Sequence, residues 1–214
     1  MTAIKIDHLT KVLKKHTVLD DITLELEENR IHGFVGQNGS GKTMLFRAVS
    51  GLIFPTSGTV EVFGRVIGKD VSFPESLGLV LENIGLYPQY SGFQNLKLLA
   101  SIQKKITDGE IREAISRVGL DPADKRPVRK YSLGMKQRIA LAQAIMEHPR
   151  LLILDEPTNA LDEEGVELIR GLVREEQERG ATVLVSSHNR EDIEQLCDTV
   201  TVLENGRVKE ARPA

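Results

Sequence analysis

A phosphate-binding loop is indicated by the residues Gly36 to Thr43, whose spacing is G-x-x-x-x-G-K-T. The glycines let successive backbone N–H groups converge on phosphate oxygens, and a helix that begins near Thr43 adds the positive end of its dipole. We expect Lys42 to reach the β- and γ-phosphates of a nucleotide and the Thr43 hydroxyl to bind Mg²⁺. The residues expected to bind the nucleotide are Gly36, Asn38, Gly39, Ser40, Gly41, Lys42, Thr43 and Met44. The alternative is a glycine-rich turn that happens to contain a lysine, and the apolar strand before the motif and the helix after it disfavour that alternative.

Two adjacent acids, Asp155 and Glu156, follow the apolar run 151–154. The end of a buried strand is a costly place for charge unless the acids have a partner, and Mg²⁺ is the obvious one. We expect Asp155 to hold the metal through water and Glu156 to polarise the water that attacks the γ-phosphate. The alternative is that both acids only cap a helix that starts near Asp162. Taken alone the two interpretations are about equal, but together with the phosphate loop the catalytic one prevails.

The elements that position these motifs alternate between strand and helix. Residues 4–9 and 18–26 alternate apolar and polar side chains as half-buried antiparallel strands do. The runs 31–35, 151–154 and 182–185 are almost continuously apolar, which indicates central strands of a covered sheet. Helical patterns follow the first two of these runs, at 43–50 and 162–178. The sequence therefore predicts an α/β fold with a mostly parallel central sheet and an N-terminal antiparallel β part.

A helical insert interrupts this alternation. Residues 94–147 have a helical pattern with no clear strand, and Thr107 with Glu110 form a candidate capping box. Near the end of the chain, Asn205-Gly206 favours a tight turn between two short strands. We expect one domain over residues 1–214, with a core at about 1–86 and 131–214 and a helical part at about 87–130. No appended regulatory domain is expected.

The composition gives no sign of a nucleic-acid protein or a membrane-spanning one. A net charge of -3 and a pI near 6.0 provide no basic field that would attract nucleic acid. Nowhere do roughly 18 consecutive apolar residues occur, so a membrane role would need a second chain. The single cysteine, Cys197, has the pattern of a packed helix end, and no leader-like segment precedes Ile4. These features favour a cytoplasmic location.

Between the two phosphate motifs lies the segment Tyr131-Ser-Leu-Gly-Met-Lys-Gln-Arg138, in which Ser132 is placed to cap a helix. It resembles the signature segment of the ATP-binding cassette (ABC) ATPases. Two further segments resemble motifs of that family in the expected order: residues 159–162 resemble the D-loop, and residues 186–188 resemble the H-loop. The resemblance covers nearly the whole chain. It implies a P-loop NTPase that uses ATP and Mg²⁺ and hydrolyses the ATP.

The resemblance also implies how two such chains act together. In the family, two ATPase domains pack head to tail, and each ATP lies between the phosphate loop of one and the signature segment of the other. Ser132 and Gly134 would then contact the nucleotide of a partner subunit, which is either a second copy or a different ATPase chain. His188 would contact the γ-phosphate and take part in catalysis with Glu156 and Lys42, and Asp162 would lie at the subunit contact.

Two positions depart from the commonest family pattern. Glu82 stands where the Q-loop usually has glutamine, and we expect it to approach the Mg²⁺. The residues that follow it resemble the subgroup that exports or confers immunity to peptide antibiotics such as bacitracin and lantibiotics. Leu13 stands where the family usually has an aromatic side chain that stacks on adenine, so we expect weak discrimination between bases.

The leading hypothesis is the ATP-binding subunit of a membrane transporter, a peptide or drug exporter, that works beside a membrane-spanning permease on the inner face of the cell membrane. The alternative is a soluble ABC ATPase that acts on nucleic acid or ribosomes. Such proteins typically contain insertions or paired cassettes that are not visible here. A nucleotide kinase or GTPase that shares only the phosphate loop would not explain the segment 131–138 or His188.

Overall fold

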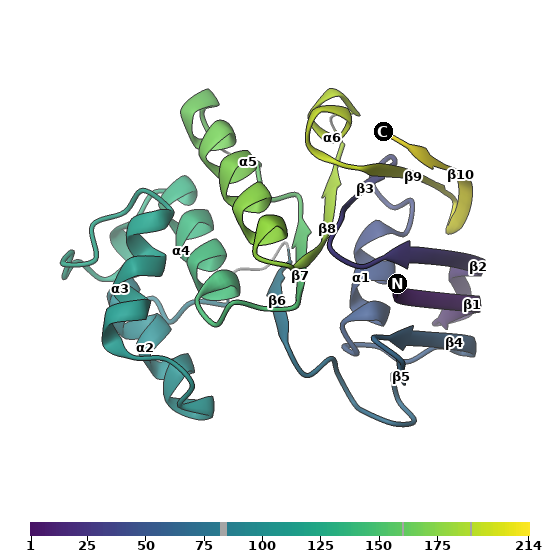
Figure 1. Ribbon diagram of the computed structural model, residues 1–214, viewed down its shortest axis with the longest axis horizontal. Helices are drawn as coiled ribbons and strands as arrows, with labels where there is room; N and C mark the ends of the chain where they lie inside the picture. The colour runs from purple at the N-terminus through teal and green to yellow at the C-terminus, as the bar shows by residue number, and fades with distance from the viewer. Residues whose placement is uncertain (82–84, 160, 189) are drawn as a thin grey trace.

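The computed structural model describes residues 1–81, 85–159, 161–188 and 190–214, without the side chains of residues 190–192. Within this part of the chain the strands form two sheets (Figure 1). The antiparallel sheet has the order β2-β1-β4-β5, with the bounds β1 (Thr2–Leu13), β2 (His16–Glu27), β4 (Ser57–Val62) and β5 (Arg65–Val66). The larger sheet has the order β10-β9-β3-β8-β7-β6, with the bounds β3 (Ile31–Val35), β6 (Leu77–Val80), β7 (Leu151–Asp155), β8 (Thr182–Ser187), β9 (Thr199–Glu204) and β10 (Arg207–Pro213).

The larger sheet is parallel from β9 to β6, and only β10 runs antiparallel to its neighbour. Every residue of β3, β7 and β8 is buried, as the continuous apolar runs predict for strands covered on both faces. The predicted antiparallel strands are also confirmed, since β1 and β2 pair along their length. The turn at Asn205-Gly206 joins β9 to β10 as expected. The predicted fold class is therefore confirmed.

Helices cover the two faces of the parallel sheet. Helix α1 (Lys42–Val49) packs between the sheets, where Phe46 meets Phe34 edge to face with ring centroids 5.2 Å apart. The opposite face is covered by α5 (Glu163–Glu178) and α6 (Arg190–Leu196). Because side chains alternate across a strand, Leu184 belongs to the first cluster, and Val183 and Val185 belong to the second. The parallel sheet thus lies between two hydrophobic cores.

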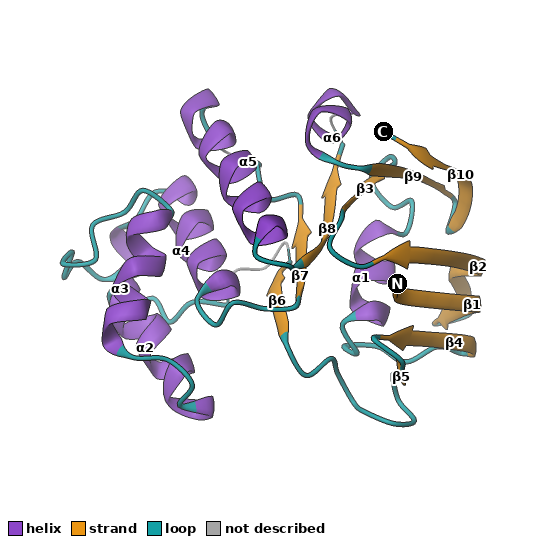
Figure 2. Ribbon diagram, in the orientation of Figure 1, coloured by secondary structure: helices purple, strands orange, loops and turns teal. Residues whose placement is uncertain are grey.

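The helical part lies on the side of the parallel sheet away from the antiparallel one (Figure 2). It contains α2 (Gly92–Gln103), α3 (Asp108–Arg117), the 3₁₀ turn η1 (Val128–Lys130) and α4 (Leu133–Ile145). The capping box predicted from Thr107 and Glu110 opens α3, and the Ser132 side chain caps α4 by accepting a hydrogen bond from the Met135 N–H at 3.1 Å. No strand occurs among residues 94–147. The proposed division of the domain at residues 87 and 130 stays a prediction.

The carboxyl ends of three strands meet at one edge of the parallel sheet. Val35 is paired with Ser187, and Asp155 is paired with Ser186, so β3, β7 and β8 end at similar levels. The loops that follow these strands therefore leave from the same edge. This is the place where open α/β sheets bind ligands.

Candidate active site

The phosphate loop spans the short gap between the end of β3 and the start of α1. Gly41 precedes the helix with a φ of 110° and provides no side-chain cap, so the first N–H groups of α1 are left for a ligand. A Cβ atom on Gly36 would lie 2.4 Å from the Leu203 carbonyl oxygen and 2.5 Å from the Ser40 hydroxyl oxygen. Only glycine fits there. The loop therefore has the shape and the uncapped helix start that an anionic phosphate chain requires.

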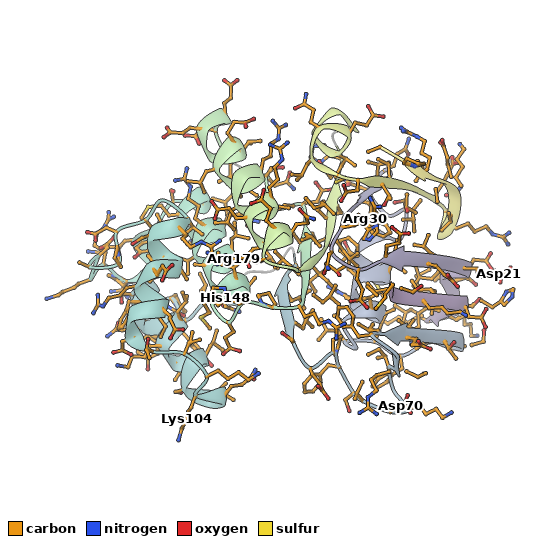
Figure 3. All side chains as sticks on the ribbon, in the orientation of Figure 1. Asp21, Arg30, Asp70, Lys104, His148 and Arg179 are labelled. Atoms are coloured by element: carbon orange, nitrogen blue, oxygen red, sulfur yellow. The ribbon has the colours of Figure 1, made fainter. Side chains whose placement is uncertain are left out.

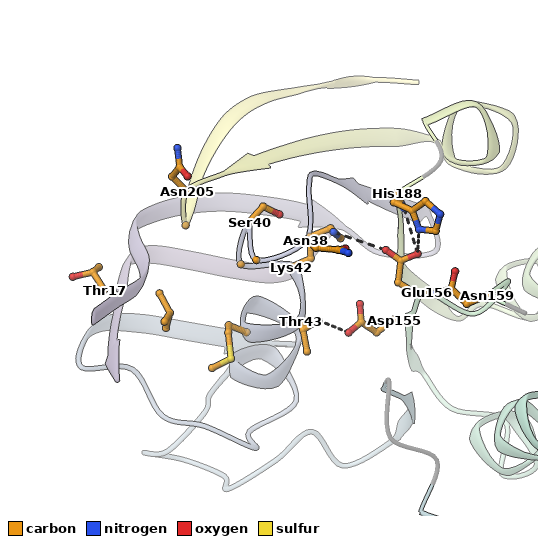
Figure 4. A pocket seen from close by; sticks show the side chains of 15 residues that line it. Thr17, Asn38, Ser40, Lys42, Thr43, Asp155, Glu156, Asn159, His188 and Asn205 are labelled. Carbon is orange, nitrogen blue, oxygen red and sulfur yellow. Dashed lines mark hydrogen bonds and ion pairs between the residues drawn. The ribbon is translucent and has the colours of Figure 1, made fainter. Parts of the chain in front are cut away.

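A cavity of about 610 Å³ opens beside this loop (Figure 4). It brings together seven of the eight phosphate-loop residues predicted from the sequence, namely Asn38, Gly39, Ser40, Gly41, Lys42, Thr43 and Met44. Gly36 does not line it. Asp155, Glu156 and His188 also line the cavity, although they are far from the loop in the sequence. The predicted phosphate and carboxylate groups are thus gathered at one place.

Asp155 ends strand β7 with its side chain 2% exposed. The Thr43 hydroxyl donates a hydrogen bond to Asp155 Oδ2 at 2.5 Å. The Ser186 hydroxyl donates to Oδ1 at 2.5 Å. Both carboxylate oxygens therefore have a hydroxyl partner, and the Thr43–Asp155 pair connects the loop to the strand.

Glu156 is held between a cation and a histidine. Its Oε1 atom lies 3.8 Å from Lys42 Nζ, and its Oε2 atom lies 2.9 Å from His188 Nδ1. Lys42 Nζ also donates to the Gly36 carbonyl oxygen at 2.7 Å. Glu156 Oε1 is buried and makes no hydrogen bond with the described residues. The backbone of Glu156 has a φ of 52°, a left-handed conformation that is unusual for a residue with a side chain.

Four predicted residues lie away from this cavity or outside the described structure. Ser132 is exposed at the start of α4, and neither it nor Gly134 lines the cavity. Asp162 caps α5 by accepting a hydrogen bond from the Gly165 N–H at 3.0 Å, and its side chain is 75% exposed. Glu82 lies outside the described residues.

The end of the cavity opposite Glu156 is lined by residues that sequence reasoning missed: Thr17, Val18, Asn205 and Gly206 (Figure 4). Leu13, which the family pattern places at the adenine, is not among the lining residues. The hairpin turn reaches the loop because the Gly206 N–H donates to the Ser40 carbonyl oxygen at 2.9 Å. The sequence indicated the turn itself, but nothing in it indicated where the turn would dock.

Comparison with known proteins identifies the family to which the chain belongs. A family model described as ABC transporter matches residues 19–159. The chain belongs to the ABC transporter family. It is an ATP-binding and ATP-hydrolysing subunit that energises transport, and the expected resemblance is confirmed. Among the described residues, no helix is both long enough and apolar enough to cross a bilayer.

Individual relatives agree with this assignment. The chain is 50% identical over 206 residues to the uncharacterized ABC transporter ATP-binding protein YybJ of Bacillus subtilis, a match that covers 96% of this chain and 94% of that protein. It is 39% identical over 214 residues to the bacitracin transport ATP-binding protein BcrA of Bacillus licheniformis, which covers 99% of this chain and 70% of that protein. A bacterial ABC transporter cassette solved as a dimer has the same fold, with a TM-score of 0.89, 22% identity and 98% of each chain covered. The alternative of an ATPase that acts on nucleic acid or ribosomes is not favoured.

Proposed function

We propose that the chain hydrolyses Mg²⁺-bound ATP in the cavity beside the phosphate loop and thereby energises the transport of a peptide antibiotic. The observation that carries the catalytic part is the convergence of Lys42, Glu156 and His188 at one end of the cavity. Lys42 is placed to bind the β- and γ-phosphates once its present contacts with Gly36 and Glu156 are replaced.

The Thr43 and Asp155 side chains fit a magnesium ion. Their oxygen atoms are 2.5 Å apart beside the loop, and Mg²⁺ is usually bound by one or two protein oxygens together with phosphate and water. No cluster of three or more histidine, cysteine or acidic side chains that could hold a metal occurs in the described part of the chain. When bound there, the ion would supply positive charge to the phosphate oxygens. Glu82 is proposed as a further contact near this position.

Glu156 is proposed as the general base. Its Oε1 atom has no hydrogen-bond partner among the described residues and is free to accept the proton of the attacking water. His188 Nδ1 lies 2.9 Å from the other carboxylate oxygen and fixes its direction. The same imidazole lies at the phosphate end of the cavity, where a contact with the γ-phosphate is within reach.

A second ATPase subunit would complete the site. Ser132 and Gly134 stand at the start of α4, a helix N-terminus suited to an anion, but neither lines the cavity of its own chain. The proposal is that they contact the ATP of a partner subunit, with Asp162 at the contact, in a head-to-tail pair that is a homodimer or a heterodimer. A cassette with the same fold was solved as a dimer.

The membrane part would come from a permease that places this chain on the inner face of the cell membrane. Tyr87 and Tyr90 are 49% and 40% exposed, and their ring centroids are 5.9 Å apart. The next aromatic residue along the chain, Phe93, is less accessible, because the Arg112 guanidinium lies 4.3 Å from its ring centroid and partly covers it. We therefore place the permease contact at the two tyrosines rather than at Phe93. The cargo class, a peptide antibiotic, is supported by the identity to BcrA.

The decisive experiment separates binding from hydrolysis. Glu156→Gln should retain ATP binding while turnover falls by roughly a hundredfold or more, because the variant lacks the base. Lys42→Ala should lose ATP binding itself. Glu163→Gln is a matched control because Glu163 is exposed at the start of α5, outside the cavity. Turnover of Glu156→Gln equal to that of Glu163→Gln would assign the base elsewhere.

A further inference from the structure

Ser186 forms hydrogen bonds with both Asp155 and Glu156 but does not line the cavity itself. It is paired with Asp155 across the parallel strands β7 and β8, and its side chain is 0% exposed. Its hydroxyl donates to Asp155 Oδ1 at 2.5 Å and accepts the N–H of Glu156 at 3.0 Å. A carboxylate can only accept and an N–H can only donate, so the direction of both hydrogen bonds is fixed. The single hydroxyl therefore serves two neighbouring residues at once.

The bond to Asp155 sets the direction of its carboxylate. With Oδ1 held by Ser186, Oδ2 faces the Thr43 hydroxyl, on the side where Mg²⁺ is proposed to bind. Without the Ser186 hydroxyl, Oδ1 would be a buried charged atom lacking its partner, and rotation of the carboxylate would be the simplest way to relieve it. Rotation would move Oδ2 away from Thr43.

The hydrogen bond from the Glu156 N–H stabilises an unusual backbone conformation at Glu156. Glu156 has a φ of 52°, which side-chain-bearing residues adopt only where the surroundings impose it. The Ser186 oxygen accepts the N–H of this residue, and the conformation directs its carboxylate toward Lys42 and His188. A buried strand residue thus provides the hydroxyl oxygen that accepts the Glu156 N–H.

We propose that Ser186 is a positioning residue for ATP hydrolysis, which aligns Asp155 for the metal and Glu156 for the attacking water without touching the nucleotide. The proposal rests on the catalytic site proposed above. It goes beyond the role expected of the segment 186–188, in which only His188 was assigned a function, because Ser186 does not line the cavity and acts through Asp155 and Glu156.

The test compares Ser186→Ala with Thr182→Val in the full chain. Thr182 is also buried in β8, and its hydroxyl oxygen also accepts a backbone N–H, from Asn29 at 3.1 Å, but it lies at the other end of the strand. Both variants lose one buried hydroxyl, and kcat is compared per folded molecule, so that a difference in folding stability between them does not enter the comparison. Only Ser186→Ala should change the chemistry.

Three measurements are made on each variant: the melting temperature, kcat and KM for ATP, and the affinity for ATP in Mg²⁺ and in EDTA. For Ser186→Ala we expect kcat to fall by about tenfold or more with KM changed by less than about threefold. The gain in ATP affinity that Mg²⁺ produces should also shrink, while the affinity in EDTA stays within about twofold. Ser186→Thr, which keeps the hydroxyl, should restore part of kcat if it folds.

The outcomes separate this proposal from the proposed function. If kcat of Ser186→Ala per folded molecule equals that of Thr182→Val, Ser186 is only structural and the proposal is wrong. The proposal is also wrong if the effect of Mg²⁺ on ATP affinity is unchanged in Ser186→Ala. If the unaltered chain neither binds nor hydrolyses ATP, the proposed function itself fails, and the role of Ser186 fails with it.

Discussion

The guanidinium of Arg117 on α3 lies 2.6 Å from the carboxylate of Glu176 on α5, and the Glu176 side chain is only 1% exposed. Arg179 lies 3.6 Å from the same carboxylate and donates a hydrogen bond to His148 Nδ1 at 3.2 Å (Figure 3). A buried carboxylate is thus shared by two cations, one from the helical part and one from the end of α5. This contact connects α3, which precedes the segment 131–138, to α5, which follows Asp155 and Glu156.

Removal of Arg117 should weaken the fold. Arg117→Ala leaves Glu176 buried with only the more distant Arg179, and breaking a buried pair in this way costs roughly 3 kcal/mol. Lys97→Ala is the control, because the Lys97–Asp108 pair is about half exposed and such pairs contribute less than about 1 kcal/mol. The free energy of unfolding in urea measures both. An equal decrease in the free energy of unfolding for the two variants would show that the buried Arg117–Glu176 pair stabilises the fold no more than the exposed pair does.

The proposed head-to-tail pair can be tested with the Glu156→Gln variant, in which turnover is expected to fall. ATP should drive it into dimers, visible by light scattering, because an uncut γ-phosphate keeps both halves attached. Addition of Gly134→Glu should abolish these dimers by placing a carboxylate beside the partner's phosphates. ATP binding to the monomer should persist, because Gly134 does not line its own cavity. Dimers that survive Gly134→Glu would place the contact elsewhere.

Base selectivity should be weak. No phenylalanine, tyrosine or tryptophan is among the described residues that line the cavity, so no such ring is available to stack on adenine. Asn205 at that end has an amide that can both donate and accept, and so accommodates either purine edge. We expect kcat/KM for GTP to lie within about tenfold of the value for ATP in steady-state assays. A deficit of more than about a hundredfold would mean that other contacts recognise the base.

Stability should fall in mild acid because of His32. Its ring is 1% exposed, Nε2 donates to the Glu27 carbonyl oxygen at 2.8 Å, and Nδ1 lies 2.7 Å from the Thr199 hydroxyl. Burial lowers the pKa of His32, although the Glu27 hydrogen bond and the nearby Asp198 oppose the shift. The unfolded chain therefore binds the proton more readily. The contribution of neutral His32 to the free energy of unfolding is fully present above the ordinary histidine pKa of about 6.5. This contribution is lost as the pH falls toward the lower pKa of the folded state, by up to about 1.4 kcal/mol per pH unit.

The measurement is urea unfolding from pH 7.5 down to pH 5, and His32→Gln should remove this part of the pH dependence. His8 provides a control of opposite sign, since its hydrogen bond to Asp21 raises the pKa of its exposed ring. The decrease in the free energy of unfolding between pH 7.5 and pH 5 should therefore not become smaller in His8→Ala. An unchanged slope in His32→Gln would assign the dependence to another group.

Patterns among neighbouring residues predicted most of the fold. The features that they missed depend on contacts between segments that are far apart in the sequence. The capping box at Thr107 and the buried runs of β3, β7 and β8 follow from neighbouring residues, and all of these are confirmed. The phosphate loop was predictable for the same reason. The end of the cavity opposite Glu156 was not predictable, because Asn205 and Thr17 reach the cavity only through the packing of two hairpins. Ser186 was seen as part of a motif, but its hydroxyl between two acids depends on strand register, which periodicity does not give.

The docking of Gly206 on the phosphate loop links ATP to the order in which the chain is made. Gly206 donates to the Ser40 carbonyl oxygen and accepts a hydrogen bond from the Asp20 N–H at 2.8 Å, so it joins the loop to the antiparallel sheet. The ribosome synthesises the loop long before this turn. A nascent chain therefore contains the loop before it contains the turn that docks on it, and a nucleotide bound beside the loop would stabilise molecules in which the β9–β10 hairpin has docked. Binding of this kind would thus select for the docked hairpin while the chain is still being synthesised.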